Sequence, residues 1–205
     1  MSEQPVLNLN GYTSLPAGHI ATVVTWLEMF EAPVGRPRVP LPGAGLSLLG
    51  ARDEARYTAI YRTLGERWMW FSRLALSKAA RAAIIGDRKV EAFAFVRNGA
   101  DAGLLELDFR VNGEAELAFF GLYETAIGQG AGRWLMDRAL ERVFARSGVK
   151  RLFVHTCTFD HPRAVDFYRA SGFVPYKTEL EVAPDPRLSG LLPRSAAPHI
   201  PIIEG

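Results

Sequence analysis

The stretch from Ala115 to Gly132, AELAFFGLYETAIGQGAG, constrains this chain more than any other part of its sequence. Its apolar first part, Ala115 to Leu122, predicts a β-strand, and a short turn then leads to Gly128, Gly130 and Gly132. Glycines at the start of a helix let the backbone approach a ligand closely, and the first N–H groups of a helix have no partner within it. Because such N–H groups favour anions, the stretch predicts a phosphate-binding loop between a strand and a helix.

Two common phosphate-binding motifs do not fit the residues that follow these glycines. A Walker loop beginning at Gly128 requires Gly-Lys where the chain has Arg133 and Trp134. A dinucleotide fingerprint requires Gly or Ala at position 133 or 135, and an acid about 20 residues further on, where Lys150 and Arg151 stand. The spacing therefore rejects both motifs.

Composition and charge exclude several other classes of protein. The 205 residues suffice for one sizeable α/β domain, and 48% hydrophobic with 11% aromatic residues is typical of a packed core. The net charge of +2 comes from interleaved basic and acidic residues, without the basic run of a nucleic-acid-binding protein. No apolar run reaches the about 18 residues of a membrane span, and residues 1–12 lack the pattern of an export signal. We expect a soluble, unexported protein.

Cysteine and histidine usage indicates neither a disulfide nor a metal site. Cys157 is the only cysteine, so no intramolecular disulfide can form and a cytoplasmic location is expected. His155, Cys157, Asp160 and His161 lie close together in the sequence, but no paired spacing such as C-x2-C accompanies them, and we expect no metal. Cys157 is expected to be a small core residue rather than a nucleophile.

Hydrophobic periodicity and turn residues predict the remaining elements. Strands are predicted for residues 20–29, 89–97, 103–111, 115–122, 151–157 and 176–182. Helices are predicted for residues 53–76, 77–85, 130–147 and 160–170, the last with Asp160 as its N-cap. Proline and glycine make residues 32–50 a predicted loop, and a proline-rich tail extends from residue 184 to 205.

The turns and the long helix predict how the strands are arranged. Asn98-Gly99 and Asn112-Gly113 are hairpin signals, so residues 89–122 are expected to form an antiparallel meander. The helix at 130–147 must pack on this sheet and return the chain parallel to strand 115–122. The prediction is an α/β (α+β) fold in one domain, residues 1–205, with a mixed, mostly antiparallel sheet and flanking helices.

A second motif follows about 30 residues later, and the pair resembles the GNAT superfamily of N-acetyltransferases. The loop 127–132 is similar to the superfamily pattern Q/R-x-x-G-x-G/A, and HPRAVDFYRASGF at 161–173 is similar to N-x-x-A-x-x-x-Y-x-x-x-G-F. Ile127 and His161 stand where the superfamily usually has Arg or Gln and Asn. The resemblance covers residues 85–182 well and says little about the first 80 residues.

This resemblance implies that acetyl-CoA, as cosubstrate, lies in a splayed gap between the strands at 115–122 and 151–157. Backbone groups near Phe120 and Leu122 would bind the pantetheine arm, which agrees with the unpaired N–H and C=O groups that an open strand pair leaves. The glycine loop would bind the diphosphate. The expected cofactor-binding residues are Phe120, Gly121, Leu122, Gly128, Gln129, Gly130, Ala131, Gly132, Arg133, His161 and Ala164.

Amine acetylation requires a base for the amine and an acid for the departing thiolate. Tyr168 is the candidate acid, because a phenol can protonate a thiolate placed beside it. The resemblance makes Glu116 the candidate base, because it precedes the expected pantetheine-binding residues as the catalytic glutamate does in the histone-acetylating branch of the superfamily. Glu28, Glu106 and Glu114 are competitors. Alternation along the strand is expected to keep Glu116, Ala118 and Phe120 on one face.

The acceptor is the least defined part of this prediction. Trp68, Trp70 and Phe71 belong to an aromatic stripe that usually packs in a core, and the resemblance leaves open that they face the acceptor instead. The expected reaction is direct acetyl transfer from acetyl-CoA to a primary amine of a small molecule or peptide. The alternative is a non-catalytic acyl-CoA-binding regulatory module. Neither nucleic acid nor membrane is expected as a partner, and a homodimer is compatible with the sequence.

Overall fold

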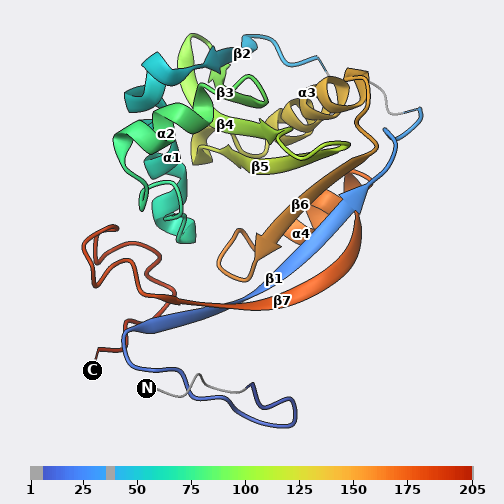
Figure 1. Ribbon diagram of the computed structural model, residues 1–205. Helices are drawn as coiled ribbons and strands as arrows, with labels where there is room; N and C mark the ends of the chain where they lie inside the picture. Colours follow the sequence, from blue (N-terminus) through green and yellow to red (C-terminus); the bar gives the residue numbers. More distant parts are fainter. Residues whose placement is uncertain (1–6, 36–39, 205) are drawn as a thin grey trace.

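The computed structural model describes residues 7–35 and 40–204, and its centre is a seven-stranded mixed sheet in the order β2-β3-β4-β5-β6-β1-β7 (Figure 1). Residues 1–6 of the N-terminal stretch and residues 36–39 of the predicted loop lie outside the described residues. One strand pair is parallel and the others are antiparallel, which confirms the predicted fold class. No helix among the described residues is long and apolar enough to cross a membrane.

The predicted meander is present as β3 (Val90–Arg97), β4 (Ala100–Asp108) and β5 (Glu114–Leu122). Asn98 and Gly99 both have positive φ angles, +52° and +84°, so they form the tight two-residue turn that the sequence indicates. Because this turn is so short, β4 begins at residue 100, three residues before the predicted start.

The region before the meander differs from the prediction in two ways. Residues 44–49 of the predicted loop form β2 (Ala44–Leu49), which pairs with β3 at the sheet edge. The predicted helix 53–76 is wrong beyond residue 65, because α1 (Glu54–Gly65) passes into a single 3₁₀ turn that ends at Met69 with φ +57°. A separate helix, α2 (Lys78–Ile85), follows with Ser77 as its N-cap.

Helices lie on both faces of the sheet (Figure 1). On one face α1 and α2 pack over β3 and β4, and Tyr57, Ile60 and Leu104 lie in this core. On the other face α3 (Ala131–Ala145) packs over β4 and β5, with α4 (Ala164–Ala170) near β7. Leu105, Leu135 and other apolar residues form this second core.

The N-terminal strand takes a place in the sheet that its sequence did not reveal. β1 (His19–Met29) lies between β6 (Arg151–Cys157) and β7 (Val174–Pro184) and pairs antiparallel with both. The pairing with β1 extends β7 beyond the predicted 176–182 at both ends. Strands from the two ends of the chain therefore lie side by side, and β1 joins β7 to β6.

The parallel pair β5–β6 opens after three residue pairs. Glu114, Ala115 and Glu116 lie opposite Arg151, Leu152 and Phe153, and beyond them the two strands are not paired. A bulge in β5 lies just past this point, because Leu107 pairs with Leu117 but Glu106 pairs with Phe119. The predicted splay is thus present and leaves backbone N–H and C=O groups on both strands without sheet partners.

The C-terminal tail is folded onto the body. Asp185 and Arg187 form a bidentate ion pair with side chains that are 2% and 1% exposed. The Arg187 guanidinium also donates to the carbonyl oxygens of Ala196 and Ile200, and the Ala197 N–H donates to the Glu66 carbonyl oxygen at 3.0 Å. The tail is therefore fixed against the turn that follows α1.

Candidate active site

A cavity of about 1010 Å³ occupies the opening between the two splayed strands. Residues 117–122 of β5 line it from one side, and residues 154–157 of β6 line it from the other. The wall continues onto the loop before α3, the start of α4, the turn after α1 and the ends of β1 and β7. The cavity therefore crosses the sheet and is reached from both faces.

The glycine loop forms one end of this cavity. Gly128 and Gly130 have φ angles of +84° and +78°, and α3 begins at Ala131 directly after Gly130. Gly128, Gly132 and Arg133 line the cavity, as do Phe120, Gly121 and Leu122 of β5. The exposed first N–H groups of α3 give this end a partial positive charge, which suits an anionic ligand.

Three of the predicted loop contacts do not line the cavity. Gly130 and Ala131 shape the turn, and the Gln129 amide donates to the carbonyl oxygen of Thr125 at 3.3 Å instead of facing the cavity. Ile127 does line the cavity, and its side chain is 49% exposed. Apolar surface thus stands where a polar phosphate contact is usual in the pattern that the loop resembles.

The second motif borders the cavity from α4. Ala164 and His161 both line it, and the His161 Nδ1 accepts a hydrogen bond from the Arg163 N–H at 3.1 Å. The prediction that Asp160 caps this helix is wrong, because α4 begins at Ala164 after Arg163. The Asp160 carboxylate instead accepts from Thr156 Oγ1 at 2.7 Å and from the Cys157 N–H at 3.0 Å.

Tyr168 reaches the cavity from α4 through an aromatic surround. The ring centroids of Phe120, Phe167 and Phe173 lie 6.4, 5.7 and 5.7 Å from that of Tyr168. The rings of Phe120 and Phe167 are 5.4 Å apart, and only 7% of Tyr168 is exposed. Within the described residues its hydroxyl has no hydrogen-bond partner. Burial, with a smaller effect of the Asp160 charge, raises the pKa of Tyr168 well above that of a free phenol. Its hydroxyl therefore stays protonated at neutral pH.

Trp70 closes the cavity from the opposite side. Its indole Nε1 donates to Asp160 at 2.9 Å, which connects the turn after α1 to the turn after β6. The indole also lies against Tyr61 and Phe119, with ring centroids 5.7 and 5.4 Å away. A side chain at Gly121 would come within 3.0 Å of the Trp70 ring, so glycine is needed for the indole to lie on β5.

Glu116 lies at the point where β5 and β6 separate, and it does not line the cavity. The expectation that Glu116 and Phe120 share a face is wrong, because the bulge places Leu117 and Phe120 on the α3 side and Phe119 on the α1 side. Glu116 Oε1 is 3.7 Å from Nε2 of His155, which does line the cavity. Burial raises the pKa of Glu116, and the His155 charge opposes this only partly.

The competing carboxylates are all held in ion pairs. Glu28 and Glu114 both bind the guanidinium of Arg151, at 2.8 and 3.0 Å. Glu106 is fully buried and binds Tyr57 Oη and Arg73 Nη2, each at 2.5 Å. Glu116 differs from these three because, among the described residues, the partner within ion-pair distance is a histidine instead of an arginine.

Cys157 lies on the cavity wall and is half-buried, so its predicted place in the core is wrong. Burial and the Asp160 charge raise the pKa of its thiol, which keeps it in the poorly nucleophilic protonated form. Within residues 7–35 and 40–204, no three His, Cys, Asp or Glu side chains lie close enough to hold a metal ion.

Several cavity residues were not foreseen as site residues in the sequence. Ile20 and Thr22 of β1, Phe159, and Glu181 of β7 line the cavity, and the sequence offers no motif that connects these positions. The sequence suggested His155 only as a metal ligand, and Asp160 only as a metal ligand or a helix N-cap. Trp68, Trp70 and Phe71 all line the cavity, and Trp70 and Phe71 also pack against the core on the α1 side.

Comparison with known structures finds the same fold. A GCN5-related N-acetyltransferase from Kribbella flavida is 18% identical with a TM-score of 0.56, over 84% of this chain and 63% of that chain. An acetyltransferase from Thermus thermophilus is 18% identical with a TM-score of 0.52, over 71% of this chain and 99% of that one. For a GCN5-related N-acetyltransferase from Sphaerobacter thermophilus the identity is 16% and the TM-score 0.52, over 81% and 53% of the chains.

A search among curated proteins found no match. The model of the family described as "Acetyltransferase (GNAT) family" matches residues 57–173, which include β5, the glycine loop, β6 and α4. Because this match extends over more than half of the chain, the protein belongs to the GNAT acetyltransferase family.

Proposed function

We propose that this protein is an N-acetyltransferase that moves the acetyl group of acetyl-CoA directly to a primary amine. The observation that carries the proposal is the single cavity that joins the glycine loop, the splayed strands and the Tyr168 hydroxyl. A long carrier with an anionic end, an amide-rich arm and a reactive thioester matches these three features in that order.

The carrier would be held mainly by backbone groups. The N–H groups at the start of α3 would bind the diphosphate, and Gly128, which has open space where a side chain would be, lets it approach. Unpaired N–H and C=O groups of residues 117–122 would bind the pantetheine amides. Gly121, Gly132, Arg133, His161 and Ala164 would complete the walls. When bound, acetyl-CoA supplies the acetyl group as a thioester.

Tyr168 would donate its proton to the sulfur as the carbon–sulfur bond breaks. Burial raises the phenol pKa, which makes Tyr168 a weaker acid than a free phenol. The same apolar surroundings disfavour a thiolate, so they raise the proton affinity of the sulfur as well. Proton transfer from Tyr168 to the sulfur therefore depends on the phenol and the sulfur lying in the same apolar surroundings.

Glu116 would accept the amine proton on the other side of the sheet. Its raised pKa brings the carboxylate nearer to the range of a useful base. Since Glu116 itself does not line the cavity, the proton would pass through His155, whose Nε2 lies 3.7 Å away on the cavity wall, or through water. One backbone N–H of the splayed β5 segment would stabilise the oxyanion of the tetrahedral intermediate.

A non-catalytic acyl-CoA-binding module is the second candidate. The burial of Tyr168 and the apolar Ile127 at the loop favour it, because both weaken contacts that a catalyst needs. Calorimetry with acetyl-CoA, CoA and ATP tests the carrier, and we expect binding of the first two only. Release of free CoA thiol in a screen of primary amines tests catalysis. Binding of acetyl-CoA without CoA release by any amine would favour the module, and tight binding of ATP alone would contradict both.

A further inference from the structure

The cavity divides into two halves on the two faces of the sheet. We call Gly128, Gly132, Arg133, Ala164 and Phe167 the carrier half. The acceptor half comprises the lining residues Trp68, Trp70, Phe71, His155, Phe159 and Glu181. This division rests on the proposed function, because it assumes that the carrier diphosphate lies at the start of α3.

The acceptor half has an aromatic wall that is already fixed in position. The Trp70 indole is held by its hydrogen bond to Asp160 and by contact with Tyr61 and Phe119. Trp68 lies beside the rings of His161 and His199, with centroids 5.4 and 6.1 Å away. A rigid wall of large rings binds a flat apolar group with little loss of side-chain entropy.

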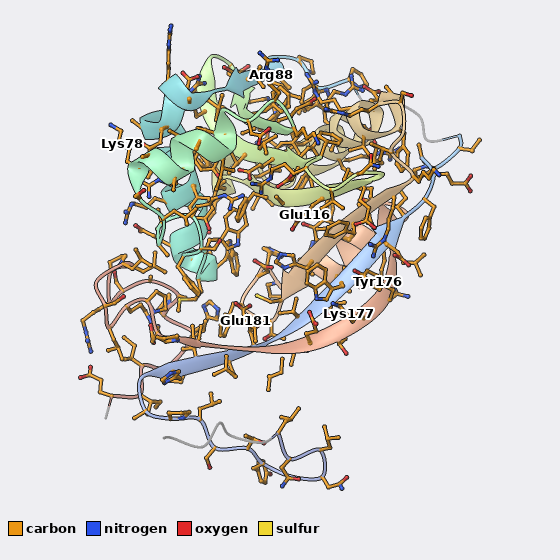
Figure 2. All side chains as sticks on the ribbon, in the orientation of Figure 1. Lys78, Arg88, Glu116, Tyr176, Lys177 and Glu181 are labelled. Carbon is orange, nitrogen blue, oxygen red and sulfur yellow. The ribbon has the colours of Figure 1, made fainter. Side chains whose placement is uncertain are left out.

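Two carboxylates, Asp160 and Glu181, border the acceptor half, and they differ in their hydrogen-bond partners. Within the described residues, Glu181 has no ion-pair or hydrogen-bond partner, whereas its strand neighbour Glu179 pairs with Lys177 at 3.1 Å. Asp160 also borders this half, but its oxygens already accept three hydrogen bonds. Figure 2 shows Glu116 on β5 and Glu181 on β7 at opposite sides of the opening. A cation entering between them meets a free carboxylate at Glu181.

We propose that the acceptor half binds a primary amine carried on an aromatic ring system and bearing a single positive charge. The ring would lie against Trp70 and Phe71, and the ammonium group would face Glu181 before it passes its proton toward His155. An aromatic body matches the wall through ring–ring contacts, and one ammonium group matches the Glu181 carboxylate, whose oxygens are not engaged by other described residues.

Other amine classes fit these residues less well. A polyamine or aminoglycoside carries several positive charges and many polar groups, whereas the wall of the acceptor half is mainly four aromatic side chains, and Glu181 is its one carboxylate without a hydrogen-bond partner among the described residues. Polar groups pressed against such a wall lose hydrogen bonds to water without replacement. These classes are therefore the comparison compounds in the test.

The test compares three amines with the full-length protein: phenethylamine, hexylamine, which has the same charge and no ring, and spermidine, which has several charges. We expect the highest kcat/KM, measured by CoA release, for phenethylamine. Calorimetric titration of each amine into the protein saturated with CoA gives a second measure that needs no turnover. Tightest binding of phenethylamine supports the inference, and equal or tighter binding of hexylamine or spermidine overturns it.

Two pairs of variants locate the effect. Phe71→Leu should weaken phenethylamine binding about 2- to 10-fold, the value of one aromatic pair, and leave hexylamine unchanged. Phe30→Leu is its control, because Phe30 is 63% exposed and does not line the cavity. Glu181→Gln should weaken both monoamines about 2- to 5-fold, the value of an exposed ion pair. Glu31→Gln, its control at an exposed carboxylate that does not line the cavity, should change neither.

Failure of this inference differs from failure of the proposed function. If acetyl-CoA binds and spermidine is acetylated while phenethylamine is not, the function holds and the aromatic acceptor is wrong. If acetyl-CoA does not bind at all, the proposed function fails. If Phe71→Leu affects phenethylamine and hexylamine equally, the ring does not lie on this wall.

Discussion

The carrier half and the acceptor half of the cavity are built from the chain in different ways. Residues 128–133 supply most of the carrier half in one contiguous loop and helix start, and α4 completes it. The acceptor half combines residues from four segments: the turn after α1, β6, the turn after β6, and β7. β1 pairs with β7, and the C-terminal tail is hydrogen-bonded to the turn after α1. Recognition by backbone groups thus comes from local sequence, and recognition by side chains comes from distant segments.

This difference separates what each half has to do. Backbone N–H groups bind a diphosphate whatever the surrounding side chains are, so a short glycine pattern suffices. An acceptor is distinguished by the shape and charge of side chains, and residues as distant as Phe71 and Glu181 must meet for that purpose. Variants in the carrier half should therefore affect every acceptor equally, whereas variants in the acceptor half should affect acceptors unequally.

The largest effect is expected from Gly130→Val in the carrier half. Gly130 has φ +78°, where a β-branched residue is strained, so the loop must move and the N–H groups of α3 lose their alignment. We expect acetyl-CoA binding to disappear in calorimetry.

Gly190→Val is the matched control for this loop variant. Gly190 has a similar φ of +74° and no neighbour within 4 Å of an added side chain, so it brings similar backbone strain away from the cavity. A normal acetyl-CoA dissociation constant for Gly130→Val would contradict the assignment of the loop, and an equal loss of binding in Gly190→Val would show that strain alone explains the result.

Tyr168→Phe should lower kcat by about one to two orders of magnitude, a moderate general-acid effect, for every acceptor tested. Acetyl-CoA affinity should change little, because the ring and its contacts with Phe120 and Phe173 are retained. Steady-state kinetics and calorimetry on the same preparation measure the two quantities. Tyr176→Phe, at a tyrosine that is 41% exposed and outside the cavity, is the control. Unchanged turnover would remove Tyr168 from the mechanism.

Much of the fold followed from local signals in the sequence. The Asn98-Gly99 turn and the glycine loop each require a backbone geometry that few residues adopt, so β3, β5 and α3 were predicted to within two residues and β4 to within three. Helix α1 was predicted too long because its apolar spacing continues past Gly65, although the chain there turns to place Trp68 and Trp70 at the cavity. Periodicity alone does not distinguish burial in a core from contact with a cavity.

The candidate site was predictable only where it is local. The splay, the loop and Tyr168 could be located from two motifs, and all of them border the cavity. The face of Glu116 was predicted wrongly because one extra residue in β5 reverses the alternation, and nothing in AELAFF signals a bulge. Glu181 could not be predicted because β7 reaches the cavity only through pairing with the distant β1.

Glu116 lies at the border between the two halves, where β5 and β6 separate. Its variant tests whether Glu116 is the base that accepts the amine proton. If Glu116 is the base, kcat/KM falls as the pH drops through its pKa, and burial places that acid limb above the range of an exposed carboxylate. Glu116→Gln should lower kcat/KM about tenfold or more and remove the limb. Glu114→Gln, which loses a contact with Arg151 instead, should keep it. An unaltered limb in Glu116→Gln would transfer the role to another group, and His155→Gln would then be the next variant.

The smallest expected effect is on stability, and its sign follows from the same burial. The folded protein raises the pKa of Glu116 above its ordinary value of 4.5, so the favourable contribution of the protonated group is complete below that value and is lost as the pH rises through the raised pKa. Glu116→Gln keeps a neutral side chain at every pH and should increase the free energy of unfolding at neutral pH by less than about 1 kcal/mol. The gain should vanish in acid.

Urea denaturation at neutral and at acid pH measures this difference between Glu116→Gln and the unmodified protein. Glu114→Gln should have the opposite sign at neutral pH, because it removes one partner of the Arg151 ion pair. Equal destabilisation by both variants would mean that Glu116 is held by favourable contacts rather than strained by burial. Its role as a base with a raised pKa would then lose its physical basis. The role of proton acceptor between the two halves would have to be assigned to His155 alone.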